Sequence, residues 1–169
     1  ICKVDKKNWC LNFDLFKSCV SKKTKAVIPV HLFGYSIDLQ EISKFCSNNN
    51  IYIIEDCAEA LGSNYNNTPV GTKYCDISTF SFFGNKVVTT GEGGMMMFKK
   101  KKFYDKAKIL RDHGMSNTKK YYHKVIGYNY RMTSLQAAIG LAQLSNLSNF
   151  IKCKVENYNL YKTYLKDCK

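Results

Sequence analysis

Four polar side chains in the middle of the chain have the types and spacing that covalent amine chemistry needs. Asp56 and Glu59 follow an apolar run that ends at Ile54. Ser81 stands among phenylalanines, and Lys86 follows it by five residues. A lysine among aromatic side chains loses part of its hydration, which favours the neutral, nucleophilic amine. A nearby aspartate could keep a pyridinium nitrogen protonated, so the group suggests Schiff-base chemistry on a pyridine cofactor.

A glycine-rich stretch, Thr89 to Gly94, comes soon after the lysine and would let the backbone approach a ligand closely. Each residue of the group also has a plain structural interpretation. Asp56 could cap a helix and Ser81 could be an ordinary strand residue. Lys86 could be one of 24 solvated lysines, since 26 basic residues include two arginines. Residue chemistry alone leaves both interpretations open.

The elements before this group predict a strand, a helix and a second strand. Ala26–Val30 is typical of a short buried strand, and Ile51–Ile54 of another. Between them, Asp38 and Glu41 have the spacing of an acidic capping box, and Asn48–Asn50 would end the helix. A βαβ unit implies a parallel sheet, and carboxylates at the carboxyl end of such strands lie where open α/β sheets bind ligands.

The elements after the group complete an α/β fold. Ile77–Phe82 and Met95–Phe98 are expected to be strands, and helical spacing recurs at Phe103, Ala107 and Leu110. The run Lys99–Lys102 is expected to be a solvated turn. No internal repeat and no Ser, Gly or Pro linker interrupts the pattern.

Two more helices are expected toward the end of the chain. Thr133 and Gln136 have the spacing of a capping box, and the inner side of that helix would carry Leu135, Ile139 and Ala142. From Leu144 onward, apolar residues at three- and four-residue steps predict a long amphipathic helix. These residues are Leu147, Ile151, Val155, Tyr158 and Leu165.

Composition narrows the class of protein. With 169 residues, 45% hydrophobic and 23% charged, the chain suits one globular domain. The net charge is +13, but only Arg111 and Arg131 are arginines, and arginine is the residue that reads phosphates and bases bidentately. We therefore expect no nucleic-acid partner. No apolar run approaches the roughly 20 residues of a membrane span, so we expect no membrane association.

The eight cysteines form no Cys-x-x-Cys pair and have no histidine at zinc-finger spacing, which favours a reduced, cytoplasmic protein without a metal. The chain begins with Ile1 rather than Met. We therefore expect that a natural upstream segment exists.

The motifs, taken in order, resemble the DegT/DnrJ/StrS family of pyridoxal-phosphate-dependent sugar aminotransferases, and the resemblance runs along nearly the whole chain. The residues at 82–86 and 113–115 are most similar to the perosamine-forming members, which aminate the 4-keto carbon of a GDP-linked 6-deoxyhexose. The matching stretches are Lys25–Gly34, Glu55–Gly62, Phe80–Gly94, Arg111–Met115, Gly127–Thr133, Leu135–Gly140 and Gln143-Leu144.

The resemblance implies an aspartate-aminotransferase-like (fold type I) enzyme, of which this chain would be the central part. Residues 1–145 would belong to the large domain that binds pyridoxal 5′-phosphate (PLP). Residues 146–169 would be a long helix leading to a small C-terminal domain after Lys169. The family's phosphate-cradling Gly-Thr segment would lie upstream, and full members would be more than twice as long.

The same resemblance implies roles for individual residues. Lys86 matches the Schiff-base lysine, and Asp56 matches the aspartate that pairs with the pyridine nitrogen. Glu59 stands beside the cofactor ring where the family often has glutamine, a carboxylate there resembling the perosamine-forming subgroup. Ser81 matches a hydroxyl donor to the cofactor phosphate. Asn129 matches an asparagine that reaches this phosphate from the neighbouring subunit of a homodimer.

The remaining motifs imply substrate contacts. His113, Tyr128 and Arg131 lie in stretches that the family places near the substrate. The implied reaction transfers nitrogen from an amino donor, glutamate by resemblance, to a nucleotide-linked 4-keto-6-deoxy sugar. Dehydrating relatives carry histidine in place of the lysine, so Lys86 disfavours that chemistry. A catalytically inert fragment that keeps only a dimerisation surface is the alternative.

Overall fold

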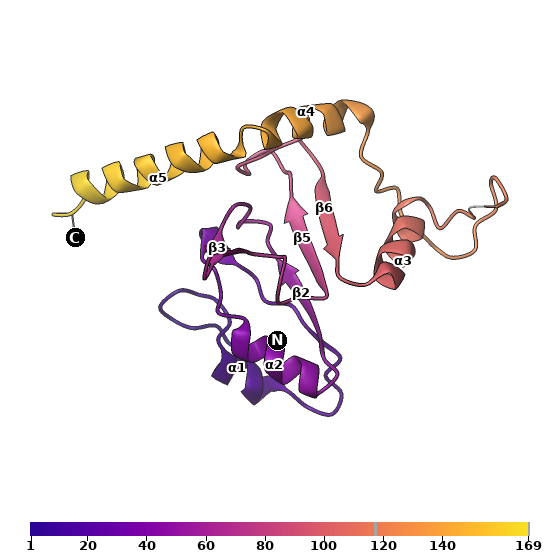
Figure 1. Ribbon diagram of the computed structural model, residues 1–169, viewed down its shortest axis with the longest axis horizontal. Coiled ribbons are helices and arrows are strands. Elements are labelled where there is room, and N and C mark those ends of the chain that lie inside the picture. The colour runs from indigo at the N-terminus through magenta and orange to yellow at the C-terminus, as the bar shows by residue number, and fades with distance from the viewer. Residues whose placement is uncertain (117, 169) are drawn as a thin grey trace.

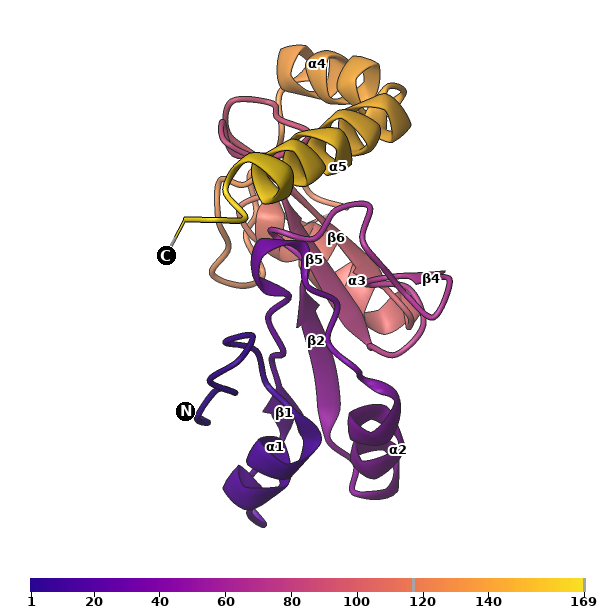
Figure 2. The same ribbon diagram turned by 90° about the vertical axis from the view of Figure 1, so that its left-hand side faces the viewer.

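The computed structural model describes residues 1–116 and 118–168 and has an α/β architecture. Its main sheet has four strands in the order β1-β2-β5-β6. Neighbours β1, β2 and β5 pair in parallel, whereas β6 runs antiparallel to β5 (Figures 1 and 2). The predicted fold class, α/β with a mostly parallel sheet, is confirmed. The strand bounds are β1 Ala26–Val27, β2 Tyr52–Asp56, β5 Ile77–Ser81 and β6 Gly94–Phe98.

Helices α1 (Phe13–Cys19) and α2 (Gln40–Asn48) close one end of the molecule. Asn12 caps α1 by accepting a hydrogen bond from the Leu15 amide at 2.9 Å. No pattern in the sequence predicted α1. These helices and the first two strands enclose the larger apolar core, whose fully buried side chains include Phe16, Leu39, Ile42 and Cys46.

The predicted start of α2 was wrong. The Asp38 carboxylate accepts a hydrogen bond from the Gln40 amide at 3.0 Å, in a turn that precedes the helix. The helix begins only after Leu39, which makes no side-chain cap, and no capping box to Glu41 forms. Ile37 and Leu39 are both buried, so core packing rather than capping fixes the entry of the chain. The predicted end near Asn48 is confirmed.

Strand β1 is short, and three further short elements lie outside the main sheet. Strand β1 stops at Val27, and Val30 makes only an isolated bridge to Asp56, because Pro29 has no amide hydrogen to donate. A 3-10 turn, η1 (Leu32–Gly34), follows. Strands β3 (Asn64–Tyr65) and β4 (Thr68–Pro69) form a small hairpin. Its tip is Asn66-Asn67, both at positive φ, as tight hairpin turns require.

Helix α3 (Lys101–Arg111) packs beside β6. All four lysines of the Lys99–Lys102 run are exposed, as expected, but only the first two precede the helix, which begins at Lys101. The turn prediction therefore held for half of the run.

Helices α4 (Ser134–Leu144) and α5 (Leu147–Tyr164) lie beyond the carboxyl end of β5, and α5 extends away from the body of the molecule (Figures 1 and 2). The capping box of Thr133 and Gln136 is confirmed, with both reciprocal hydrogen bonds present. The long helix starts at Leu147, after a break at 145–146, rather than running on from Leu144. Among the described residues, no helix has the length and hydropathy of a membrane span.

The predicted inner side of α4 was also wrong. Leu135 is 80% exposed, Ile139 is 50% exposed and Ala142 is exposed. The side of α4 that meets the rest of the chain instead carries Gln136 and Gln143, for reasons given below.

Candidate active site

The parallel pairing of β2 and β5 places two of the predicted site residues on one face of the sheet. Asp56 pairs in register with Thr79, and Ser81 lies two residues farther along β5. Because side chains alternate along a strand, Asp56, Thr79 and Ser81 point to the same side. All three are half-buried, whereas Glu55, Ser78 and Phe80 on the other side are buried. A carboxylate and two hydroxyls therefore share the open face near the carboxyl end of the sheet.

The lysine that the sequence singled out faces a carboxylate. The Lys86 Nζ lies 3.5 Å from the Oε1 of Glu59, with the two side chains 20% and 33% exposed. Lys86 stands in the turn after β5, where its amide donates to the carbonyl of Phe83 at 3.0 Å. Phe82 is buried and Phe83 is half exposed, so only one of the two aromatic neighbours is part of the interior. The structure thus brings Lys86 and Glu59 together.

Glu59 is anchored by a distant segment of the chain. Its second carboxylate oxygen, Oε2, accepts a hydrogen bond from the Phe33 amide at 2.9 Å. Phe33 has φ +51° and ψ +30°, a left-handed conformation that a bulky residue adopts only under constraint. Gly34 follows at φ +81°, and its carbonyl accepts from the Ser63 hydroxyl at 2.9 Å. The η1 turn therefore fixes the carboxylate that faces Lys86.

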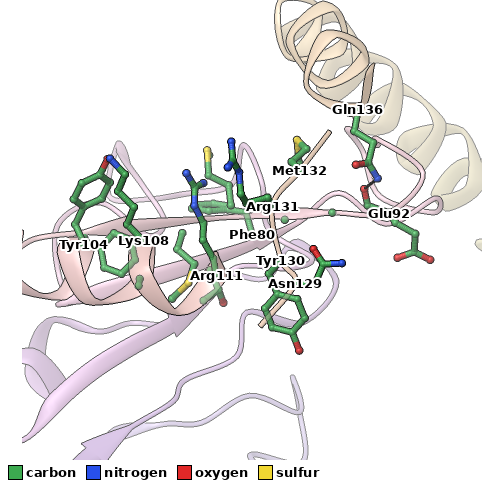
Figure 3. A pocket seen from close by; sticks show the side chains of 17 residues that line it. Phe80, Glu92, Tyr104, Lys108, Arg111, Asn129, Tyr130, Arg131, Met132 and Gln136 are labelled. Carbon is green, nitrogen blue, oxygen red and sulfur yellow. Dashed lines mark hydrogen bonds between the residues drawn. The ribbon is translucent and has the colours of Figure 1, made fainter. Parts of the chain in front are cut away.

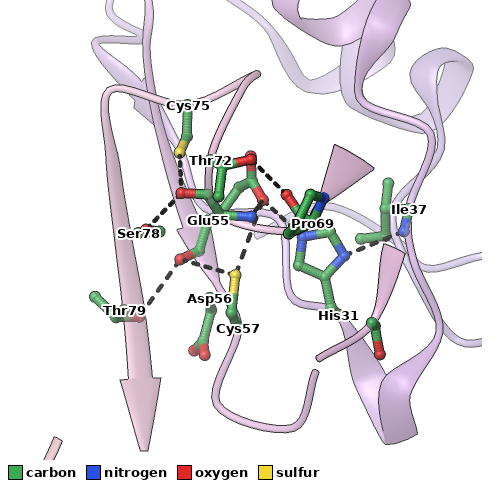
Figure 4. Close-up of polar contacts among 12 residues, drawn as sticks. His31, Ile37, Glu55, Asp56, Cys57, Pro69, Thr72, Cys75, Ser78 and Thr79 are labelled. Carbon is green, nitrogen blue, oxygen red and sulfur yellow. Dashed lines mark hydrogen bonds and ion pairs between the residues drawn. The ribbon is translucent and has the colours of Figure 1, made fainter. Parts of the chain in front are cut away.

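A buried polar cluster supports this turn and the end of β2 (Figure 4). The amide of Ile37 donates to His31 Nδ1 at 3.1 Å, which assigns the ring proton to Nε2. Nε2 lies 3.1 Å from Glu55 Oε2, which also accepts from the Gly71 amide at 2.6 Å. His31 and Glu55 are each 1% exposed. Glu55 therefore joins β2 to the segments that carry His31 and Gly71, on the face of the sheet opposite to Asp56.

Residue type alone would allow this cluster to bind a metal, since ligand atoms of His31, Glu55 and Cys57 lie within 4.8 Å of one another. The polar atoms of His31 and Glu55 already have partners within the chain, since both nitrogens of His31 and Oε2 of Glu55 make hydrogen bonds. Burial, reinforced by the neighbouring Glu55, raises the pKa of Cys57 far above its usual range, and burial likewise raises that of Cys75 to about 12. The cluster is better explained as a hydrogen-bonded structural core.

Helix α4 holds the glycine-rich turn that follows Lys86. The Thr89 amide donates to Gln143 Oε1 at 2.9 Å, and the Gln136 amide nitrogen Nε2 donates to the Glu92 carbonyl at 3.1 Å. Gly140 lies between the two glutamines, and a Cβ at that position would come within 2.8 Å of the Thr90 methyl group. Because the backbone of the turn needs polar partners, α4 turns the side chains of its two glutamines toward the turn and its leucine side chains toward solvent.

Lys86 and Glu59 both line a cavity of about 690 Å³. Ser81 and Asn85 line it from the β5 side, and Phe33 lines it from η1. Helix α5 contributes the opposite wall through Ile151, Lys154, Val155 and Tyr158. The volume of this cavity is within the range typical of binding sites for small molecules.

Asn129 lies elsewhere, in a second cavity of about 590 Å³ between β6, α3 and the segment before α4 (Figure 3). Both arginines of the chain, Arg111 and Arg131, line this second cavity. Arg131 also pairs with Asp112, at 3.4 Å. Within one chain, therefore, Asn129 and Arg131 line a cavity other than that of Lys86.

The remaining two predicted substrate contacts also lie outside the Lys86 cavity. His113 lines a shallow depression with His123 and has φ +57°, and its amide donates to the Tyr128 carbonyl at 2.9 Å. The rings of Tyr128 and Tyr130 stack at 5.1 Å. The substrate roles of His113, Tyr128 and Arg131 stay predictions.

A family model described as the DegT/DnrJ/EryC1/StrS aminotransferase family matches residues 1–169. The chain belongs to this family. GDP-perosamine synthase of Escherichia coli O157:H7 is 46% identical over 158 residues, which cover 94% of this chain and 43% of the relative. The chain thus spans less than half the length of this curated family member.

Solved aminotransferases have the same fold over the matched region. The Helicobacter pylori aminotransferase PseC, involved in pseudoaminic acid biosynthesis, superimposes with a TM-score of 0.91 at 29% identity, over 98% of this chain and 45% of PseC. A sugar aminotransferase of Streptococcus pneumoniae, solved in its PLP form, gives 0.84 at 27% identity, over 96% of this chain and 47% of that enzyme. The predicted family and the similarity to perosamine synthases are confirmed.

Proposed function

We propose that this chain is part of a PLP-dependent aminotransferase that acts on a nucleotide-linked 4-keto-6-deoxy sugar. One observation carries the proposal: the amine of Lys86 faces a carboxylate inside a cavity that opens where two parallel strands end. The 46% identity to a GDP-perosamine synthase supports the sugar class. Glutamate is the amino donor that we propose.

The residues at the end of the sheet fit this cofactor by their chemistry. The group needs an amine for its aldehyde, an acid for its ring nitrogen and donors for its phosphate. Lys86, Asp56 and Ser81 supply one of each, and Asp56 and Ser81 share one face of the sheet. Asp56 Oδ1 already accepts from the Ala58 amide at 3.0 Å, which fixes its carboxylate. When bound, PLP supplies an electron sink for the carbon from which a proton is removed.

The chain's own residues would hold the reactants and move the proton. Lys86 Nζ would be the base that takes the proton from the α-carbon of the amino donor and holds it at the reacting centre. Asp56 would keep the ring nitrogen protonated. Glu59 would hold the free amine of Lys86 on the cavity wall, at the distance seen between them. The glycine-rich turn, held by α4, would keep this wall in place.

We further propose that the working enzyme is a homodimer in which Asn129 of one subunit completes the phosphate site of the other. The position of Asn129 supports this, because it lines the second cavity rather than the one with Lys86. The competing hypothesis, an inert fragment that keeps only a dimerisation surface, draws on the short span of the chain relative to its curated family member.

Visible absorbance on mixing the purified chain with PLP separates these hypotheses. We expect a new band from the covalent attachment of PLP, and we expect its loss in Lys86→Ala. Lys73→Ala is the matched control, since Lys73 is another lysine beside an aromatic ring, 5.2 Å from the centroid of Tyr74, but does not line the Lys86 cavity. An unchanged spectrum in the parent chain would favour the inert fragment.

A further inference from the structure

The lining of the Lys86 cavity includes an exposed aromatic ring that is not part of the apolar core. Phe33 is 81% exposed and lines the cavity from the η1 turn. Its strained left-handed conformation is maintained by the hydrogen bond from its amide to Glu59 and by the bond between Ser63 and Gly34. An exposed apolar ring gains nothing from burial, and backbone strain of this kind is concentrated at functional sites. The turn thus presents the Phe33 ring to the cavity.

The opposite wall of the same cavity presents a cation. Helix α5 meets the 61–63 turn through Ile151 and Leu147, and Gly62 has no side chain at the point of contact. A Cβ on Gly62 would overlap the Ile151 side chain. The helical repeat then brings Lys154, Val155 and Tyr158 to the cavity on the same side as Ile151. Packing at Gly62 therefore sets the side of α5 on which Lys154 lines the cavity.

The charge of the cavity lining is not balanced. Its charged residues are Lys86, Lys154 and Glu59, and Glu59 pairs with Lys86. Within residues 1–116 and 118–168, no carboxylate lies within ion-pair distance of Lys154. The nearby Lys152 on the same helix, by contrast, pairs with Glu156 at 4.0 Å. The cavity thus keeps one uncompensated positive charge across from an exposed ring.

We propose that Phe33 and Lys154 bind the nucleoside diphosphate part of the substrate, the ring stacking on the base and the ammonium pairing with the diphosphate. Aromatic rings stack on any nucleobase, and lysine binds phosphate as a point charge. The cavity volume of about 690 Å³ suits a ligand of this size. This inference rests on the proposed function and adds two specificity-determining residues to it.

Calorimetric titration of the chain at low salt tests the pair with three probes: GDP, guanosine and inorganic pyrophosphate. Phe33→Leu should weaken GDP and guanosine roughly tenfold and leave pyrophosphate unchanged. Lys154→Glu should weaken GDP and pyrophosphate by at least a similar factor and leave guanosine unchanged. The parent's affinity for GDP, but not for guanosine, should fall as salt is added.

Two control variants match these changes. Tyr121→Leu also removes an exposed aromatic ring from a residue at positive φ, here +58°, away from the cavity. Lys162→Glu reverses a charge on α5 two turns beyond Lys154, outside the lining. Both should bind all three probes as the parent chain does. A parent chain that binds no GDP, or target variants that behave like their controls, would overturn the proposal.

Two further readouts separate this inference from the function on which it rests. L-Glutamate should bind the parent and Lys154→Glu equally, and a loss confined to glutamate would assign Lys154 to the amino donor and overturn the nucleotide role. Borohydride trapping of PLP on Lys86 should persist in both target variants. If trapping succeeds and GDP binding ignores both substitutions, the inference fails while the function stands. If trapping fails and the GDP pattern holds, the nucleotide-binding role of the two residues stands while the proposed PLP-dependent function fails.

Discussion

The carboxylate of Glu59 joins the amine of Lys86 to the backbone of Phe33. One oxygen lies 3.5 Å from Lys86 Nζ, and the other accepts the Phe33 amide hydrogen at 2.9 Å. The three residues come from three separate segments, so this one side chain fixes the distance between the η1 turn and the lysine. Its substitution therefore tests whether the cavity wall is held by polar contacts or by packing.

Replacement of Glu59 separates its two contacts. Glu59→Ala leaves the Phe33 amide without an acceptor, and we expect the free energy of unfolding to fall by about 1 kcal/mol. Glu59→Gln keeps an acceptor for that amide and should lose less than half as much, because a partly exposed ion pair contributes little. Urea denaturation of the two variants measures this difference. Equal losses would show that the amide does not depend on the carboxylate.

The buried cluster of His31 and Glu55 should be important for stability. Glu55→Ala leaves two buried donors, the His31 Nε2 and the Gly71 amide, without an acceptor, so we expect a loss of about 3 kcal/mol or more. Glu55→Gln retains an oxygen for both donors and should cost markedly less. Thermal unfolding by circular dichroism can rank the variants. If alanine were tolerated as well as glutamine, the hydrogen bonds in Figure 4 would not be what holds this region.

The loop that carries His113 and Tyr128 depends on a close approach of two backbone segments. A Cβ on Gly127 would overlap backbone atoms of His113 and Gly114, which cannot move aside as a side chain could. Gly127→Ala should therefore cost about 2 kcal/mol and raise hydrogen exchange throughout residues 113–129.

Gly84→Ala is the matched control, since a Cβ there would meet one backbone oxygen at an ordinary 3.9 Å. It should leave stability within about 0.5 kcal/mol of the parent. If both variants behaved alike, the close approach of residues 114 and 127 would be incorrect.

The cysteines should differ widely in their rates of alkylation. Burial raises the pKa of Cys46 to about 11 and those of Cys57 and Cys75 further, whereas a hydrogen bond from Cys2 lowers that of the exposed Cys19. Because the thiolate is the nucleophile, a lower pKa means faster reaction at pH 8. A short pulse of iodoacetamide should label Cys19 and spare the three buried thiols until urea is added. Peptide mass mapping identifies the labelled cysteines, and early labelling of Cys57 would show that the cluster of His31, Glu55 and Cys57 is open to solvent.

Local patterns predicted the main sheet well, and the structure brings two of the proposed site residues, Lys86 and Glu59, together. The continuous apolar run at 51–54 predicted β2, and the segment 77–82, where serine and threonine are interspersed with apolar residues, predicted β5, each to within two residues at each end. The parallel pairing then brought Asp56 and Ser81 to one face, as expected for residues at strand ends. The capping box at Thr133 was equally local and equally successful.

Long-range partners were the part that sequence patterns could not predict. The Phe33 amide meets Glu59 across 26 residues, and Thr89 meets Gln143 across 54. Helical periodicity placed Leu135 inward. The backbone of the glycine-rich turn, however, forms hydrogen bonds with the side-chain amides of α4, so the side with the glutamines faces the turn and Leu135 is exposed. A polar residue inside an apolar stretch, as Glu55 is after Ile54, was the available signal for the buried cluster. The role of Lys154 had no such signal, since it is one lysine among many.

The most direct test of the central claim is to find the residue that PLP modifies. The chain is incubated with PLP, reduced with borohydride, digested and mapped by mass spectrometry, and the mass of the reduced pyridoxyl group is located on one peptide. We expect that peptide to span residues 80–94, with the label on Lys86 and none on the exposed Lys99–Lys102 run. Label that falls mainly on the Lys99–Lys102 run, or that persists in full in Lys86→Ala, would contradict the assignment of Lys86.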